Sequence, residues 1–242
     1  MTRLFAFGCS FTNYRWMTWA DIMGTQYDQY YNWGQSGAGN SFIFNSVMEA
    51  DQRHNFGPGD TVLVCWTNVT REDRYVKGRG WITLGNVTSS PIFTKEFIAD
   101  AVCERGYLIR DLAMIKATQS YLQHSEATWK FMAMCPLTQP DPWDDKKMHD
   151  QDVCDLYNDV LAAVSASFTE VLGHGYWQHN IKQRYRYADG GVDYHPTTQE
   201  HLLYLDTVLP NWMTNNDLRQ QIAANALIMN KRANGSCTQP RL

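Results

Sequence analysis

Residues 4–12 read LFAFGCSFT, an apolar run that ends in a turn of small residues carrying Ser10. A short apolar run bounded by a turn is typical of a strand buried inside an α/β sheet. Such sheets bind their ligands at the carboxyl ends of the strands. We therefore expect Ser10 to lie at the end of the first strand, at the edge of the sheet where a reacting side chain would meet its substrate.

Strand patterns alternate with helix patterns along the rest of the chain. The clearest further strand is TVLVCW at 61–66, which is apolar, rich in β-branched residues and preceded by a Pro-Gly turn. Strands are also expected at 3–8, 27–33 and 129–135, and helices at about 17–23, 41–52, 107–122, 153–172 and beyond 197. This alternation predicts a parallel sheet covered on both faces, which is a three-layer α/β/α fold.

The length of 242 residues, 44% of them hydrophobic and 19% charged, is enough for one sizeable core and short for two. We expect one domain over residues 1–214. A stretch rich in charged residues and glycine, at about 71–92, is expected to pass over the sheet edge as an insertion and to border a binding site. The polar residues 215–242 predict a C-terminal appendage that serves as an arm or depends on a partner.

Charge and hydropathy exclude several classes of partner. The formal net charge is -4 and no Lys/Arg-rich run occurs, so we expect no binding to nucleic acid. No segment approaches the roughly 20 apolar residues that span a bilayer. The N-terminus also lacks a signal-peptide pattern, so we expect a soluble protein made in the cytosol.

The cysteines and the glycine-rich turns indicate no cofactor. The six cysteines are scattered without a C-x-x-C pair and are expected to be reduced and mostly buried. No spacing of His, Cys and Asp is typical of a metal site. The glycines near Gly37 lack the lysine of a P-loop and the full dinucleotide fingerprint. We therefore expect neither a metal nor a cofactor.

Four small motifs follow predicted strands or precede a predicted helix. In chain order they are GCSFT at 8–12, NWGQSG at 32–37, WTN at 66–68 and DYHP at 193–196. Together they resemble the four blocks of the SGNH/GDSL hydrolase family, in which Ser, Gly, Asn and His occur in this order. The resemblance extends over residues 3–209 and implies a flavodoxin-like α/β/α fold.

The resemblance implies a role for one residue or more of each block. Ser10 is the nucleophile, and His195 is the base that activates its hydroxyl. Asp193 orients the imidazole; two residues apart on an extended segment, the two side chains project from the same side of the chain. The backbone N–H groups of Ser10 and Gly37 and the side-chain amide of Asn68 stabilise the oxyanion.

Three positions depart from the family pattern. Cys9 stands where the first block usually has an acid, and the third block, WTNV at 66–69, keeps only its Asn. Asp193 lies two residues before His195, whereas the family spacing is three. The orienting group therefore remains open between Asp193, Asp189 and a backbone carbonyl.

Ser36 is a rival nucleophile. GQSGA at 34–38 comes close to the Gly-x-Ser-x-Gly elbow of α/β-hydrolases, and it likewise follows a strand and precedes a helix. That fold takes its acid and base from separate strand ends, which the neighbouring pair of Asp193 and His195 does not match. Ser10 is therefore preferred.

Each motif, taken alone, also has a structural explanation. GCS at 8–10 reads as a turn, and Asn68 reads as a cap of a turn or helix. Thr197 or Thr198, with Glu200, predicts the cap and capping box of a helix that follows the pair.

The resemblance implies ester hydrolysis through an acyl-enzyme. The abundance of aromatic residues, 13% of the chain, and the lack of an apolar lid favour an acetylated glycan, and so a carbohydrate O-acetyl esterase or short-chain esterase. FGCSFT at 7–12 with the later DYHPT at 193–197 is also similar to SGNH-like proteins often carried by bacteriophages, which implies a virion-borne enzyme. The alternative is a catalytically silent structural or glycan-binding protein of the same fold, assembled as a homo-oligomer or in a virion.

Overall fold

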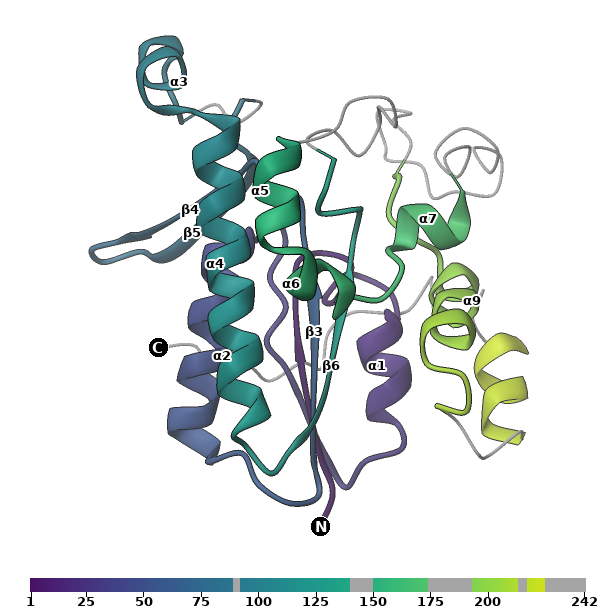
Figure 1. Cartoon of the computed structure of the whole chain (residues 1–242). Coiled ribbons are helices and arrows are strands. Elements are labelled where there is room, and N and C mark those ends of the chain that lie inside the picture. The colour runs from purple at the N-terminus through teal and green to yellow at the C-terminus, as the bar shows by residue number, and fades with distance from the viewer. Residues whose placement is uncertain (89–91, 140–149, 174–192, 213–216, 225–242) are drawn as a thin grey trace.

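The computed structural model describes residues 1–88, 92–139, 150–173, 193–212 and 217–224 (Figure 1). Its centre is a sheet in the order β2-β1-β3-β6, formed by β1 (Arg3–Phe7), β2 (Gln29–Asn32), β3 (Asp60–Trp66) and β6 (Thr128–Ala133). Each neighbouring pair of these strands is parallel. The predicted strands and their parallel arrangement are confirmed.

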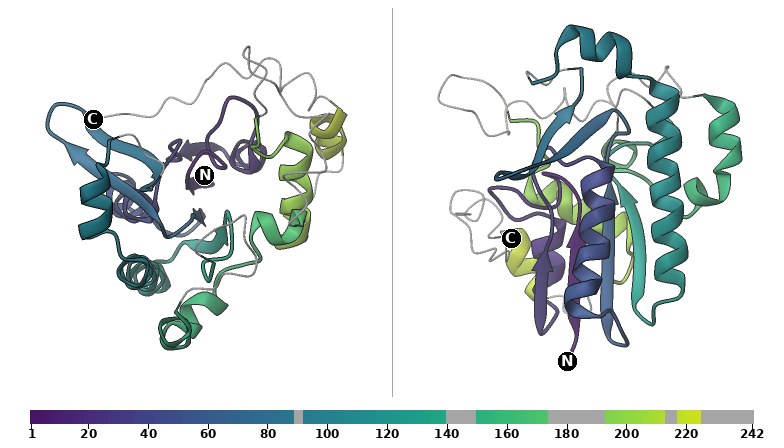
Figure 2. Two further views of the ribbon diagram at one scale, coloured as in Figure 1. Left: turned by 90° about the horizontal axis from the view of Figure 1, so that it is seen from above. Right: turned by 90° about the vertical axis from the view of Figure 1, so that its left-hand side faces the viewer.

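Helices cover both faces of this sheet (Figure 1 and Figure 2). On one face lie α2 (Asn40–His54) and α4 (Glu104–Gln123), which pack against each other. On the other face lie α1 (Trp19–Gly24) and α9 (Thr198–Val208), with α7 (Phe168–Leu172) packed against α9. The predicted three-layer α/β/α fold is therefore confirmed.

The strands are apolar on both faces because helices cover both. Residues 4–7 of β1 have no exposed surface, and Trp66 at the end of β3 has none either. Near-continuous apolar strands are typical of parallel sheets that are buried on both sides. The register pairs Phe7 with Val64 and Trp66 with Ala133, so the strands end at one common edge of the sheet.

The prediction of a single helix at 153–172 is wrong. Three short helices take its place: α5 (Gln151–Leu156), α6 (Asn158–Ala162) and α7. Between the last two, Val164 forms a parallel bridge with Phe131 of β6. A capping box of Ser167 and Glu170 then begins α7. Apolar residues recur every four positions at Leu156, Val160 and Phe168, which predicts one helix, but they belong to α5, α6 and α7 in turn. Val160 and Phe168 are buried, whereas Leu156 is exposed.

The predicted insertion at about 71–92 begins with an antiparallel hairpin. β4 (Arg71–Val76) pairs with β5 (Gly80–Asn86) as a separate sheet, which projects beside α2 and α4 in Figure 1. The Asp73 carboxylate of this hairpin accepts the backbone N–H groups of Gly39 and Phe42, both at 2.8 Å. It thereby satisfies open N–H groups at the start of α2, so the hairpin is fastened to the loop that follows β2. The chain then enters α3 (Lys95–Ala101), which was not predicted.

Within the predicted appendage at 215–242, the structure describes residues 217–224, and they are helical. Ile222 in this helix is buried, and Arg219 forms an ion pair with Asp206 of α9. These described residues therefore pack against α9 and the core. Among the described residues, no helix is both long and apolar enough to cross a bilayer.

Candidate active site

Ser10 lies in a tight turn at the carboxyl end of β1. The backbone N–H groups of Thr12 and Asn13 both donate to the Cys9 carbonyl, at 2.9 and 3.2 Å, which bends the chain around Ser10. Gly8 enters this turn at φ +156°, and a Cβ there would lie 2.1 Å from Thr12 Oγ1, so only glycine fits. Neither the hydroxyl nor the backbone N–H of Ser10 donates a hydrogen bond to any described residue. Both donors therefore have no acceptor among the described residues, although Ser10 is largely buried.

Asp193 and His195 form the contact expected from their spacing. His195 Nδ1 lies 2.7 Å from Asp193 Oδ1, and the backbone N–H of His195 donates to the same oxygen at 3.0 Å. The Asp193 side chain has no exposed surface, whereas that of His195 is 27% exposed. A two-residue gap therefore suffices to place a buried carboxylate against a partly exposed imidazole.

Two opposing effects set the ionisation of Asp193. Burial raises the pKa of this carboxyl, but hydrogen bonds from His195 and Tyr14 lower it by a larger amount. The pKa of Asp193 therefore lies well below its usual range. Asp193 is therefore a carboxylate at neutral pH, and a carboxylate only accepts hydrogen bonds. His195 Nδ1 must then carry a proton, which makes Nε2 the nitrogen that can act as a base.

Tyr14 is the third member of this cluster, and the sequence blocks do not contain it. Its hydroxyl donates to Asp193 Oδ2 at 2.7 Å. Its ring stacks on the His195 imidazole, with the ring centroids 3.8 Å apart and the planes at 19°. No local pattern could have identified it, because its partners lie near the other end of the chain.

Further contacts hold this cluster against the turn of Ser10. The Phe11 ring lies edge-on to the His195 ring, 5.8 Å between centroids. Trp16 Nε1 donates to the Pro196 carbonyl at 2.7 Å. Ser10 and His195 form no hydrogen bond with each other in this structure; catalytic contacts of this kind often tighten only when substrate is bound.

The start of α9 follows the pair directly. Thr197 is the N-cap and forms a capping box with Glu200, so the predicted cap is confirmed. The Thr198 hydroxyl donates to the Met17 carbonyl at 3.0 Å, which anchors the first turn of the helix to the loop after β1. Asp189, the other candidate acid, lies outside the described residues.

Gly37 lies in the loop after β2, where the hairpin packs against it. Its φ is +75°, and its carbonyl accepts the N–H of Gly85 at 2.9 Å. A Cβ at Gly37 would lie 2.6 Å from the Thr83 carbonyl oxygen. The Gly37 N–H donates to no described residue. The Gly37 carbonyl thus fastens the loop to the hairpin, while the Gly37 N–H has no acceptor among the described residues.

We expect replacement of Gly37 by alanine to lower the free energy of unfolding by about 3 kcal/mol, because the Cβ adds a clash with the hairpin to the cost of a positive φ. Gly78 in the hairpin turn is the matched control, since its φ is +77° and nothing lies within 4 Å of a Cβ there. Gly78→Ala should cost only about 1 kcal/mol. Urea denaturation measures both; equal losses would show that the contact with Thr83 does not constrain the loop.

Asn40, the first residue of α2, joins that helix to the residue that follows β3. Its Oδ1 accepts the Thr67 N–H at 2.9 Å, and its Nδ2 donates to the Thr67 carbonyl at 3.0 Å. The same Nδ2 donates to the buried Asp111 at 2.8 Å. Because Thr67 directly precedes Asn68, Asn40 ties the start of α2, three residues after the second sequence block, to the third block.

Asn68 is buried at the carboxyl end of β3. Its side-chain oxygen accepts the Thr70 N–H at 2.8 Å and also the Thr70 hydroxyl. Burial raises the pKa of the Cys135 thiol to about 12, and a hydrogen bond with Asn68 opposes this rise. The side-chain oxygen of Asn68 is thus engaged by Thr70, while its amide nitrogen is the donor.

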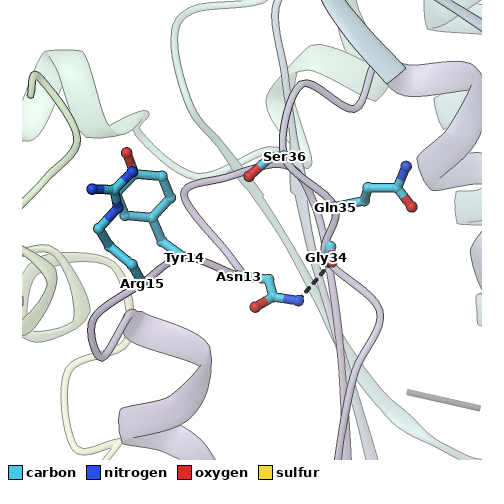
Figure 3. Close-up of a pocket in the computed structure, with 6 residues that line it drawn as sticks. All are labelled: Asn13, Tyr14, Arg15, Gly34, Gln35 and Ser36. Carbon is cyan, nitrogen blue, oxygen red and sulfur yellow. Dashed lines mark hydrogen bonds between the residues drawn. The ribbon is translucent and has the colours of Figure 1, made fainter. Parts of the chain in front are cut away.

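A pocket of about 400 Å³ opens between the loops that follow β1 and β2. Its lining consists of Asn13, Tyr14, Arg15, Gly34, Gln35 and Ser36 (Figure 3). In Figure 3, Tyr14 and Arg15 stand together on one side, the Ser36 hydroxyl is turned toward them, and Gln35 points away. Ser10 does not line this pocket, but the pocket borders the Tyr14 ring that contacts His195 and the loop that carries Gly37.

Ser36, the rival nucleophile, is exposed in this pocket. Its carbonyl accepts the Thr83 hydroxyl at 2.8 Å, and its own hydroxyl donates to no described residue. The pair of Asp193 and His195 instead contacts the segment that follows Ser10.

No group of three or more His, Cys, Asp and Glu side chains in the described residues could hold a metal ion. Five cysteines in the same part of the chain are free thiols: Cys9, Cys65, Cys135 and Cys154, which are buried, and Cys103, which is exposed.

No protein-family model and no curated protein matches this chain. Solved structures do. A member of the lipolytic protein G-D-S-L family from Veillonella parvula shares 14% identity over 89% of this chain and 100% of its own, with a TM-score of 0.46. The psychrotrophic esterase EstA from Pseudoalteromonas sp. shares 12% identity over 89% and 100%, with a TM-score of 0.44.

A catalytic mutant of the acetylxylan esterase Axe2 from Geobacillus stearothermophilus shares 14% identity over 88% of this chain and 97% of its own, with a TM-score of 0.42. At these TM-scores the likenesses carry no argument about the reaction or its residues. These three solved structures, to which this chain is similar, are thus a G-D-S-L family protein and two esterases.

Proposed function

We propose that this chain is a serine ester hydrolase that works through an acyl-enzyme. Ser10 is the nucleophile, His195 the base and Asp193 the acid that orients the imidazole. The observation that carries this proposal is the hydrogen-bonded pair of Asp193 and His195, held against the turn of Ser10 although it lies near the other end of the chain. The resemblance of the sequence blocks supports the same roles.

The reaction has two halves. Ser10 Oγ attacks the carbonyl carbon of the ester while His195 Nε2 takes the hydroxyl proton, which gives a tetrahedral oxyanion. The bond between this carbon and the alcohol oxygen then breaks, and the alcohol leaves with the proton that His195 returns. Water attacks the acyl-enzyme and gives a proton to His195. That proton returns to Ser10 Oγ as the free acid departs.

The oxyanion is stabilised by hydrogen-bond donors at the ends of three neighbouring strands. These are the backbone N–H groups of Ser10 and Gly37 and the side-chain amide of Asn68. The two backbone donors bind no described residue, which suits donors that are kept for a reacting oxygen. Losing one such donor typically lowers the rate on the order of a hundredfold.

The substrate is a short-chain ester, and we favour an O-acetyl group on a carbohydrate. Side chains of Asn13, Arg15 and Ser36 give the pocket a polar lining that suits the hydroxyl groups of a sugar. Its volume of about 400 Å³ lies within the range of small-molecule sites. The resemblance to phage-borne proteins supports a virion enzyme that acts on a host surface polysaccharide.

Labelling with a fluorophosphonate probe, together with hydrolysis of p-nitrophenyl acetate, tests the proposal. The wild type is expected to be labelled and active, Ser10→Ala unlabelled, and Ser36→Ala labelled. Labelling that survives Ser10→Ala and is lost in Ser36→Ala would identify Ser36 as the nucleophile. A screen of acetylated polysaccharides then identifies the alcohol, because each active substrate releases acetate.

The second candidate function is a catalytically silent glycan-binding or structural protein. Two observations favour it: Ser10 and His195 do not hydrogen-bond in this structure, and the side-chain oxygen of Asn68 is engaged by Thr70. The hairpin and residues 215–242 would then serve assembly into an oligomer or a virion. A wild type that is neither labelled nor active, yet binds an acetylated glycan without releasing acetate, would support this candidate over the enzyme.

A further inference from the structure

Tyr14 lies where two distant segments of the chain meet. His195 contacts Oδ1 of Asp193 twice: its Nδ1 lies 2.7 Å from this oxygen, and its backbone N–H donates to it at 3.0 Å. The Tyr14 hydroxyl takes the other oxygen, Oδ2, at 2.7 Å. Both carboxylate oxygens are therefore held, and by donors from different segments, so rotation of the carboxylate would break contacts on both sides.

The Tyr14 ring restrains the imidazole as its hydroxyl restrains the carboxylate. It lies nearly parallel to the His195 ring, with centroids 3.8 Å apart. The Trp16 ring meets Tyr14 edge-on at 4.6 Å, and the Arg15 guanidinium lies 5.5 Å from the centroid of the Tyr14 ring. Trp16 is itself tied to the Pro196 carbonyl. The tyrosine ring is thus packed between the His195 and Trp16 rings.

We propose that Tyr14 is the positioning residue of the His195–Asp193 pair: its hydroxyl fixes the carboxylate, and its ring fixes the plane of the imidazole that faces the turn of Ser10. The kinetic part of this inference rests on the proposed esterase function. The structural part does not, since it concerns only the geometry of the pair.

The stacked ring also has a consequence for the reaction. When His195 takes the proton from Ser10, its imidazole becomes a cation that lies on the face of the Tyr14 ring. The electron-rich face of an aromatic ring attracts a cation. Tyr14 therefore favours the protonated intermediate as well as the orientation of the base.

The kinetic test compares Tyr14→Phe, which keeps the ring, with Tyr14→Leu, which removes both restraints. We expect Tyr14→Phe to lower kcat about tenfold, as loss of a hydrogen bond to a charged group implies, with little change in KM. Tyr14→Leu should lower kcat about a hundredfold through misplacement of the base, and raise KM because Tyr14 lines the pocket.

Tyr30→Phe is the matched control. The Tyr30 hydroxyl also donates to a carboxylate, Asp21 Oδ1 at 3.1 Å, but it lies on β2 rather than at the pair. This variant loses the same kind of hydrogen bond and is expected to keep the kcat of the wild type. Equal kcat values for Tyr14→Phe, Tyr30→Phe and the wild type would overturn the positioning role.

A spectroscopic readout separates failure of this inference from failure of the proposed function. In a Ser10→Ala background, which has no nucleophile, NMR follows the His195 Nδ1 proton that bonds to Asp193. We expect this proton to exchange with water at least about tenfold faster when Tyr14→Phe is added. If exchange is unchanged, Tyr14 does not position the pair, whatever the activity; if it accelerates in a protein without esterase activity, Tyr14 positions the pair and the esterase function fails.

Discussion

Replacing Ser10 with alanine, replacing His195 with alanine and replacing both are expected to lower kcat to the same residual value, about a millionfold below that of the wild type. A serine hydroxyl without its base is a weak nucleophile, and the base without the hydroxyl has no proton to take. Once one of the two residues has been replaced, replacing the other therefore causes no further loss of activity. Hydrolysis of p-nitrophenyl acetate, followed with each purified variant, measures the effect.

The matched control for this set is His124→Ala. His124 is exposed at the C-terminus of α4, where its Nδ1 contacts the Ser120 carbonyl. Its replacement should change kcat by no more than about twofold, as is usual for a surface site. Losses that multiply in the double variant would show that Ser10 and His195 act in separate steps, and would contradict a nucleophile activated by this base.

The sheet could be predicted from the sequence because each of its strands has a local pattern of apolar residues. The run at 61–66 is β-branched and apolar, and β3 extends it by one residue to Asp60. Residues 4–7 are continuously apolar because helices cover both sides of β1. The hairpin at 71–86 could not be predicted so well, because its exposed strands carry charged residues and its contacts are with a distant loop.

The residues of the candidate site also fall into two groups: those that a local sequence pattern predicts, and those that only the fold brings together. The contact between Asp193 and His195 follows from a two-residue spacing in an extended segment, and the cap at Thr197 follows from its capping box. Tyr14 could not be found in this way, because its bond to Asp193 exists only after the fold has joined the loop after β1 to the start of α9. The same holds for Asn40, whose bonds to Thr67 join the start of α2 to the end of β3.

Replacing Asp193 with asparagine is expected to lower kcat about ten-thousandfold while the protein stays folded. If the amide nitrogen takes the place of Oδ1, it donates to His195 Nδ1 and forces the imidazole proton onto Nε2, where it blocks the base. If it takes the place of Oδ2, it faces the Tyr14 hydroxyl instead. The negative charge that stabilises the protonated imidazole is lost in both arrangements.

Asp60→Asn is the matched control, because Asp60 is also buried and held by hydrogen bonds, but from Arg3 at the opposite edge of the sheet. It should lower the melting temperature and leave kcat unchanged. The two wild-type carboxylates share one further property: burial raises the pKa of each, and hydrogen bonds lower it more.

A pH series separates the structural contribution of Asp193 from its role in the reaction. A carboxyl whose pKa is lowered by folding contributes stability above its unfolded pKa of about 3.9, and loses it as the pH falls through the folded pKa. The melting temperature of the wild type should therefore fall on acidification below about pH 4 more steeply than that of Asp193→Asn, which has no proton to take up. If Asp193→Asn instead keeps most of the wild-type kcat at neutral pH, the carboxylate does not orient the base. The role would then pass to Asp189 or to a backbone carbonyl, and the bond from Tyr14 to Asp193 would only hold the fold together.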